Sequence, residues 1–174
     1  MASLSPELLA TAVDAYDRKI RPLAYVSLNR AQLSAALCTK STLLVEGPNR
    51  TGKSFFGYWL CASTAQGKNP NKHLFRVGTK NNPFKIRYVS TPENFTDEVQ
   101  PGLVKLFPPG SIIQSSKDSQ NGYYRRWQTC VDGVYAKITF LSVDQDVKKF
   151  ESTAVDLIIA DEPMQEDQYC TPTT

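Results

Sequence analysis

The chain has 174 residues, of which 41% are apolar and 10% aromatic, and it carries a formal net charge of +3 at pH 7. This length allows one domain with a sizeable core, and the absence of an apolar run of about 18 residues argues against a membrane span. The small positive charge permits a nucleic-acid partner without indicating one.

The beginning of the chain predicts a helix rather than a leader. In SPELLATAVDAY (5–16), Ser5 suits the cap, Pro6 suits the first turn, and the apolar residues fall on one face. Acids in this stretch, with no basic leader before an apolar run, argue against a signal peptide and predict a cytoplasmic location. A second helix is predicted over NRAQLSAAL (29–37).

The middle of the chain predicts strand, loop, helix and strand in turn. The apolar run STLLVEG (41–47) predicts a short strand that leads into a glycine-rich loop. The next helix is predicted over GKSFFGYWLCASTAQ (52–66). From 68 to 87 the chain has six basic residues and no acid, and much of this stretch has loop composition. KIRYVS (85–90) predicts a second strand.

The last third of the sequence completes an α/β pattern. TPENFTDEVQPGLVKLF (91–107) predicts a capped helix, kinked or broken at Pro101. Two alternating runs around Asp132-Gly133 predict a β-hairpin. The apolar run within VDLIIADEP (155–163) suits a strand buried on both faces of a parallel sheet. We therefore expect an α/β domain with a mostly parallel sheet and an added antiparallel hairpin.

The segment GPNRTGKS (47–54) matches the pattern G-x-x-x-x-G-K-[ST] at Gly47, Gly52, Lys53 and Ser54. Glycines let the backbone N–H groups point at phosphate oxygens, and the positive end of the following helix adds to that field. Lys53 is predicted to reach the β- and γ-phosphates, and Ser54 to give its hydroxyl to Mg²⁺. The nucleotide-binding set is completed by Pro48, Asn49, Arg50 and Thr51. The alternative is a glycine turn before a surface lysine.

Two acids, Asp161 and Glu162, follow the apolar run at 157–160. At the carboxyl end of a parallel strand, Asp161 is predicted to hold Mg²⁺ through its water shell. Glu162 is predicted to polarise a water for attack on the γ-phosphate. A helix cap or a solvated loop is the alternative for such a pair. A glutamate here favours hydrolysis over transfer to a metabolite, a reaction that must exclude water.

Together these segments resemble the ATPase part of a phage terminase large subunit, the motor that packages DNA into phage heads. The resemblance spans roughly residues 25 to 165 and rests on NRAQLSAAL, the arginine-bearing loop GPNRTGKS, and KKFESTAVDLIIADEP, which ends in the family's DEP. The family more often has glutamine and glycine where this chain has Glu151 and Ser152. The coupling motif and the nuclease domain of the family are not recognisable, so endonuclease activity is not expected.

The resemblance implies a three-layer P-loop NTPase domain of the RecA/ASCE type that hydrolyses ATP with Mg²⁺. It implies an N-terminal helical segment over 1–40 with adenine-side residues, and an ATPase core over 41–174. Gln32 would contact the adenine edge through its amide, and Arg50 would act in cis like an arginine finger. A polar helix-surface residue and a solvated loop arginine are the alternatives. The implied partners are double-stranded DNA, a portal protein, a terminase small subunit and a ring of copies, in the host cytoplasm.

Other functional classes remain open. A helicase-like or other DNA-remodelling ATPase would share both motifs, and a nucleotide-dependent binding module would switch shape without turnover. A small-molecule kinase would need an acceptor pocket, and a nucleotide-binding fragment would be inactive on its own. The basic stretch 68–87 and GYYRRW (122–127) are candidate DNA contacts, although a solvated loop and strand packing account for them more simply. Four distant cysteines and a single histidine give no metal-site spacing, so buried free thiols are expected.

Overall fold

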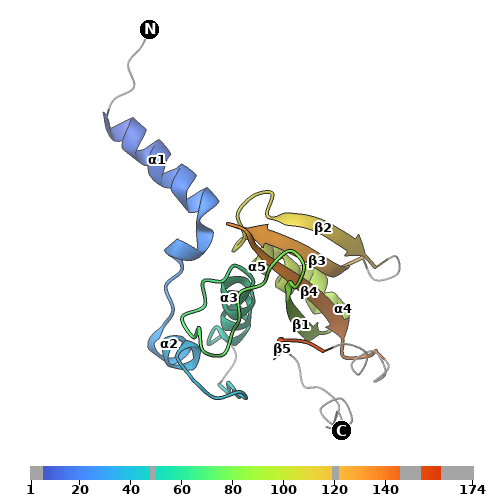
Figure 1. The fold of residues 1–174 in the computed structure, drawn as a ribbon. Helices are drawn as coiled ribbons and strands as arrows, with labels where there is room; N and C mark the ends of the chain where they lie inside the picture. Colours follow the sequence, from blue (N-terminus) through green and yellow to red (C-terminus); the bar gives the residue numbers. More distant parts are fainter. Residues whose placement is uncertain (1–5, 48–49, 119–121, 146–153, 162–174) are drawn as a thin grey trace.

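The computed structural model describes residues 6–47, 50–118, 122–145 and 154–161 (Figure 1). The elements in chain order are α1 (Pro6–Ile20), the 3₁₀ helix η1 (Pro22–Tyr25), α2 (Arg30–Ala36), α3 (Lys53–Ala65), β1 (Phe84–Ser90), α4 (Pro92–Asn94), the π-helical η2 (Phe95–Val99), α5 (Gln100–Val104), β2 (Ile112–Lys117), β3 (Tyr124–Val131), β4 (Val134–Ser142) and β5 (Leu157–Ala160). No helix in these ranges is both long and apolar enough to cross a membrane.

The described strands form one mixed sheet in the order β2-β3-β4-β1-β5. β1 runs parallel to β4 on one side and to β5 on the other, whereas β3 is antiparallel to both β2 and β4. The α/β class is therefore confirmed, and half of the described strand pairings are parallel.

The predicted hairpin is also confirmed. Asp132 and Gly133 have φ angles of 51° and 81°, and Val131 pairs with Val134 directly across the two-residue turn. Positive φ at both central positions gives the turn a twist that matches the twist of the strands, and Asp-Gly is a favoured pair for it.

The core lies on one face of the sheet, which we call the inner face. The helix α3 and the helical segment 92–104 cover this face. The largest core side chains within the strands and helices are aromatic: Tyr58, Phe84, Tyr88, Phe95, Trp127 and Phe140. The ring of Phe140 packs edge-on against Trp127 at 4.9 Å and against Phe95 at 5.5 Å. The opposite, outer face is covered by no described helix (Figure 1).

The predicted helix over 91–107 is present, and its irregularity takes a specific form. The backbone N–H of Asn94 donates to the Thr91 hydroxyl at 3.3 Å, which caps the segment. A π turn over Phe95–Val99 then precedes Pro101. Because the proline ring would clash with a carbonyl in a regular α-turn, a widened turn lets the helix continue past it.

Two strand expectations are wrong in the described structure. Residues 41–47 form no strand, and Leu44 is 79% exposed, because no described strand lies beside them to pair with their backbone. β5 is not buried on both faces: Ile159 is buried, but Ile158 is 50% exposed on the outer face. Within the described residues β5 pairs only with β1, so it forms an edge of the sheet.

The N-terminal helices were predicted correctly, although their packing is sparse. α1 extends beyond the predicted range to Ile20 and projects away from the sheet (Figure 1). Its apolar residues Leu9, Val13 and Tyr16 are more than half exposed. Of the free thiols in the described residues, Cys61 is buried as expected, whereas Cys38 and Cys130 are partly exposed.

Asp156 ties the start of β5 to β1 and to the loop before it. Its carboxylate accepts from Arg76 Nη2 at 2.7 Å and from the backbone N–H of Lys85 at 2.8 Å. Burial alone would raise the pKa of Asp156, but the bonds from Arg76 and Lys85 outweigh it and lower that pKa. Folding therefore gains stability from this group at neutral pH.

We expect Asp156→Asn to lower the free energy of unfolding by about 1–3 kcal/mol at pH 7. In the wild type, the stability that ionised Asp156 gives to the fold is fully present above the ordinary aspartate pKa. It is lost as pH falls through the lowered pKa of Asp156 in the folded state. The difference between the two proteins should therefore shrink toward pH 2 in urea unfolding. Asp14→Asn, which breaks an exposed pair with Arg18, is the control and should lower the free energy of unfolding much less. Equal losses in both variants would contradict the prediction.

Candidate functional site

The glycine-rich loop ends where α3 begins. Gly52 has a φ of 81°, a left-handed conformation, and its carbonyl accepts the N–H of Phe56 at 3.0 Å to start the helix. A Cβ at Gly52 would also lie 2.8 Å from Gln32 Nε2. With no side chain at this position to cap it, the first turn of a 13-residue helix presents its N–H groups at the positive end of the dipole. This arrangement suits an anion.

Lys53 folds back across the loop. Its Nζ donates to the carbonyl oxygen of Gly47 at 2.6 Å. The Thr51 hydroxyl lies 3.2 Å from the position that a Cβ on Gly47 would take. These contacts bring the two ends of the loop together. Arg50 is exposed and has a φ of 65°, which is uncommon for a residue with a side chain.

Gln32 lies beside the loop, on the short helix α2. Its Nε2 donates to the carbonyl oxygen of Gly52 at 2.9 Å, and its Oε1 accepts the N–H of Asn29 in a capping box. The side chain therefore joins α2 to the start of α3 in this structure. Its predicted contact with adenine remains a prediction, and that contact would compete with these bonds.

Asp161 stands at the carboxyl end of β5. Its backbone N–H donates to Val89 O at 3.0 Å, which extends the pairing with β1 by one residue. Burial raises the pKa of its carboxyl above the ordinary value, and the charge of Glu98 adds to that rise. The Ser54 and Tyr88 hydroxyls and the Lys53 ammonium oppose it, so these groups lie close to the carboxyl. The loop and the end of β5, far apart in sequence, thus meet at one point.

Two tyrosines that sequence reasoning missed lie behind Asp161. The hydroxyls of Tyr58 and Tyr88 and the Oδ2 of Asp161 are buried and have no hydrogen-bond partner of ordinary geometry among the described residues. Burial, followed by the charges of Asp161 and Glu98, raises the pKa of Tyr58 to about 12. Burial likewise raises the pKa of Tyr88. Both phenols therefore stay protonated and face the carboxylate as neutral groups.

Gly57 allows α3 to approach the sheet at this point. A Cβ there would lie 2.9 Å from the Tyr88 hydroxyl and 3.6 Å from Ile159 Cγ2. Only a residue without a side chain fits without moving Tyr88. The close approach places Ser54, one turn earlier on α3, beside the end of β5. The glycine in GKSFFG was visible in the sequence, but its purpose depends on which strand α3 contacts.

The residues that converge here can serve a phosphate group and a hydrated cation. An uncapped helix start and the Lys53 ammonium suit the phosphate. The Ser54 hydroxyl and the unpartnered Asp161 oxygen suit Mg²⁺, which keeps several waters and takes few protein ligands when phosphates are present. Within the described residues no group of three or more His, Cys, Asp or Glu side chains is placed to hold a metal on its own.

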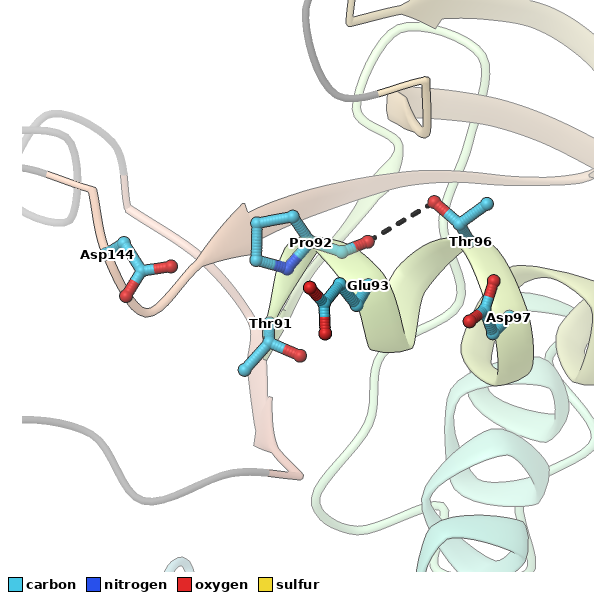
Figure 2. A pocket seen from close by; sticks show the side chains of 6 residues that line it. All are labelled: Thr91, Pro92, Glu93, Thr96, Asp97 and Asp144. Carbon is cyan, nitrogen blue, oxygen red and sulfur yellow. Dashed lines mark hydrogen bonds between the residues drawn. The ribbon is translucent and has the colours of Figure 1, made fainter.

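An open hollow of about 600 Å³, lined by none of Lys53, Ser54 and Asp161, lies at the carboxyl ends of β1 and β4 (Figure 2). Its lining residues are Thr91, Pro92, Glu93, Thr96, Asp97 and Asp144. Figure 2 shows Glu93 and Asp97 on the helical segment and Asp144 across from them, after β4. Three carboxylates without a lining cation repel phosphate, so the glycine-rich loop is the better candidate for a nucleotide.

The remaining predicted site residues, Pro48, Asn49 and Glu162, lie outside the described residues. Comparisons of the chain with protein-family models, with curated proteins and with solved structures found no match.

Proposed function

We propose that this chain binds Mg-ATP and hydrolyses it, as the ATPase part of a phage terminase large subunit with a P-loop NTPase fold. One observation carries the proposal: Ser54 in the loop and Asp161 after β5, roughly a hundred residues apart, meet beside the start of α3. The motif alone predicts a phosphate site, and the proximity of these two groups supports the cation position that hydrolysis would also require.

Each residue then has a defined task. Lys53 and the first N–H groups of α3 would neutralise the β- and γ-phosphates, while Ser54 and Asp161 would hold the hydrated Mg²⁺. Bound Mg²⁺ would offset the charge that develops on the phosphate oxygens. Glu162 orients a water for in-line attack on the γ-phosphorus and accepts its proton. The bond from that phosphorus to the bridging oxygen breaks, so that ADP and phosphate leave. Arg50 stabilises the charge of the transition state.

In the described structure Lys53 is bonded to Gly47 O, so a bound nucleotide must draw its ammonium away. A phosphate offers a charged acceptor in place of a neutral carbonyl, and charge-assisted hydrogen bonds are roughly twice as strong. We therefore expect the loop to exchange an internal bond for a bond to the nucleotide.

The test is phosphate release from Mg-ATP, with Lys53→Ala compared with the wild type. Removing the ammonium should weaken ATP binding at least tenfold and abolish most of the turnover. Lys72→Ala, at an exposed loop position, is the control and should behave as wild type. Turnover that is the same in all three proteins would refute the assignment of the loop. Binding without turnover in the wild type would instead indicate a nucleotide-dependent binding module.

The wider role rests on the family resemblance. It places the protein in the host cytoplasm, transiently at a capsid portal, with a small subunit, copies of itself and the DNA that it moves. Stimulation of turnover by a portal protein would favour this role over that of a helicase-like or other DNA-remodelling ATPase.

A further inference from the structure

The outer face of the sheet carries a row of positive charges that the proposed nucleotide site does not use. Burial alternates along β4, and successive side chains of a strand point to opposite faces of a sheet. Lys85 and Arg87 on β1 and their partners Lys137 and Thr139 on β4 flank the inner-face Ile86, Tyr88 and Ile138, so they point to the outer face. Two regular rows of register partners cross this face from β1 to β2. The first is Lys85, Lys137, Gln128 and Gln114, and the second is Arg87, Thr139, Arg126 and Ser116.

Neither row contains an acidic residue. Asp156 borders the first row beside Lys85, but its carboxylate is already bound by Arg76. Lys85 and Lys137 are direct partners on adjacent strands. Like charges directly opposite each other destabilise a sheet, so this pair is costly to the folded chain unless an anion is present.

The charges are close enough to affect one another. Burial lowers the pKa of Lys137, and the positive charges of Arg126 and Lys85 lower it further. Arg126 is exposed and Lys85 and Lys137 are partly exposed, whereas Arg87, in the second row, is only 5% exposed. Three reachable cations therefore share one patch, which we call the basic sheet patch (Lys85, Arg126 and Lys137).

The length of the patch and the polar side chains around it indicate which kind of anion it would bind. Adjacent strands lie about 4.8 Å apart, so the patch extends roughly 10 Å across three strands, with Arg126 in the row next to that of Lys85 and Lys137. The hydroxyl and amide side chains of Thr139, Gln128 and Ser116 lie in the same rows. Lys, Arg, Ser, Thr and Gln are the side chains that contact the phosphates and sugars of DNA. Neither the hollow beside Glu93 and Asp97 nor the one beside Pro108 and Asp132 is lined by these residues, and a row of cations across a sheet suits an extended backbone.

We propose that the basic sheet patch binds the phosphate backbone of double-stranded DNA. This extends the proposed function, since a packaging motor must hold duplex DNA. The patch shares only Lys85 with the basic stretch 68–87 and only Arg126 with GYYRRW, so the other basic residues of both segments are not expected to contact DNA. The outer face and the nucleotide site are joined by β1, which carries Lys85 on one face and Tyr88 on the other.

The test measures binding of a fluorescein-labelled duplex of about 20 base pairs by anisotropy, without ATP and over a series of salt concentrations. In the triple variant Lys85→Gln, Arg126→Gln, Lys137→Gln, we expect affinity at about 50 mM salt to fall at least tenfold. The slope of log K against log salt should become shallower by about two to three, roughly one for each lost phosphate contact.

The control removes the same charge elsewhere, with Lys68→Gln, Lys72→Gln and Lys80→Gln in the exposed loop, and should lose less than about threefold. An equal loss in both triple variants would mean that only net charge matters, and it would overturn the proposal. So would a larger loss in the loop variant. Absence of duplex binding by the wild type at low salt would also overturn it and would leave an acidic protein surface as the occupant to seek.

A single substitution tests the patch in a variant that is expected to keep its fold. Arg126→Gln alters one exposed side chain, so the fold should persist, with a loss of about threefold and a slope change of about one. Unchanged binding in this variant would count against the patch. Because no nucleotide is present, a chain that fails to hydrolyse ATP can still pass this test, and an active ATPase can still fail it.

Discussion

Replacing Glu162 with glutamine should leave ATP bound while its turnover falls by about 10²–10⁴-fold. Glutamine keeps the size of the side chain and can still hydrogen-bond a water, but it cannot accept the proton of that water. Glu162 lies outside the described residues, and the expectation rests on its place directly after Asp161. Single-turnover phosphate release and the affinity for a fluorescent ATP analogue measure the two effects separately.

Glu93→Gln is the matched control. Glu93 is an exposed glutamate that lines the acidic hollow and is not part of the glycine-rich loop, and its loss should leave both quantities unchanged. If Glu162→Gln turned over ATP at the wild-type rate, Glu162 would not be the base. If it lost ATP binding as well, its role would be in the ground state rather than in the attack by water.

Asp161→Asn should make the protein without nucleotide more stable and, if the proposed function holds, should lower its turnover of ATP. Burial raises the pKa of Asp161, so the folded state disfavours its ionised form. The stability that this group contributes is fully present below the ordinary aspartate pKa and is lost as pH rises through the raised folded pKa. At pH 7 the buried carboxylate therefore carries a cost, which the neutral amide removes. We expect a gain of about 0.5–2 kcal/mol in the free energy of unfolding.

Loss of the same carboxylate should lower the affinity for Mg²⁺, so that half-maximal turnover needs about 10–100 times more Mg²⁺. Urea unfolding at pH 7 and at pH 3 measures the stability term, and the gain should vanish at the lower pH because wild-type Asp161 is then protonated. Titration of Mg²⁺ at fixed ATP measures the other effect. A variant less stable than wild type at pH 7 would show that the carboxylate is held by favourable contacts, contrary to the prediction.

The parts of the fold that the sequence predicted well are those fixed by local chemistry. Asp132-Gly133 specifies its turn because both residues tolerate positive φ, and α3 follows from a glycine loop and a run of helix-compatible residues. Strands depend on neighbours instead. Residues 41–47 have a strand-like composition and no described partner, and β2 has a partner but a polar sequence, IIQSSK, that gave no signal. Burial of β5 was overestimated for the same reason.

For the candidate site, too, local sequence predicted some residues, whereas the contacts that depend on tertiary packing could not be predicted. Spacing within 47–54 and the acids after β5 identified Lys53, Ser54 and Asp161, because phosphate and Mg²⁺ require those groups in that order. Nothing local indicated that Lys53 would bond Gly47, or that Tyr58 and Tyr88 would stand behind Asp161. These contacts arise where α3 crosses β1 and β5, and a single sequence does not reveal which elements cross.

The register of β1 has a consequence for how the chain assembles. The hairpin of β3 and β4 joins neighbours in sequence, but β1 pairs with β4 and β5 across roughly 50 and 70 intervening residues. Closing such long loops lowers the entropy of the chain before the stabilising contacts have formed, so these pairings form late and slowly. During synthesis the hairpin can fold as soon as it emerges, whereas Asp161 reaches Ser54 only after β5 has docked. Pulse-labelling hydrogen exchange should find the amides of β5 protected last among the described strands, so that the candidate nucleotide site is completed only at the end of folding.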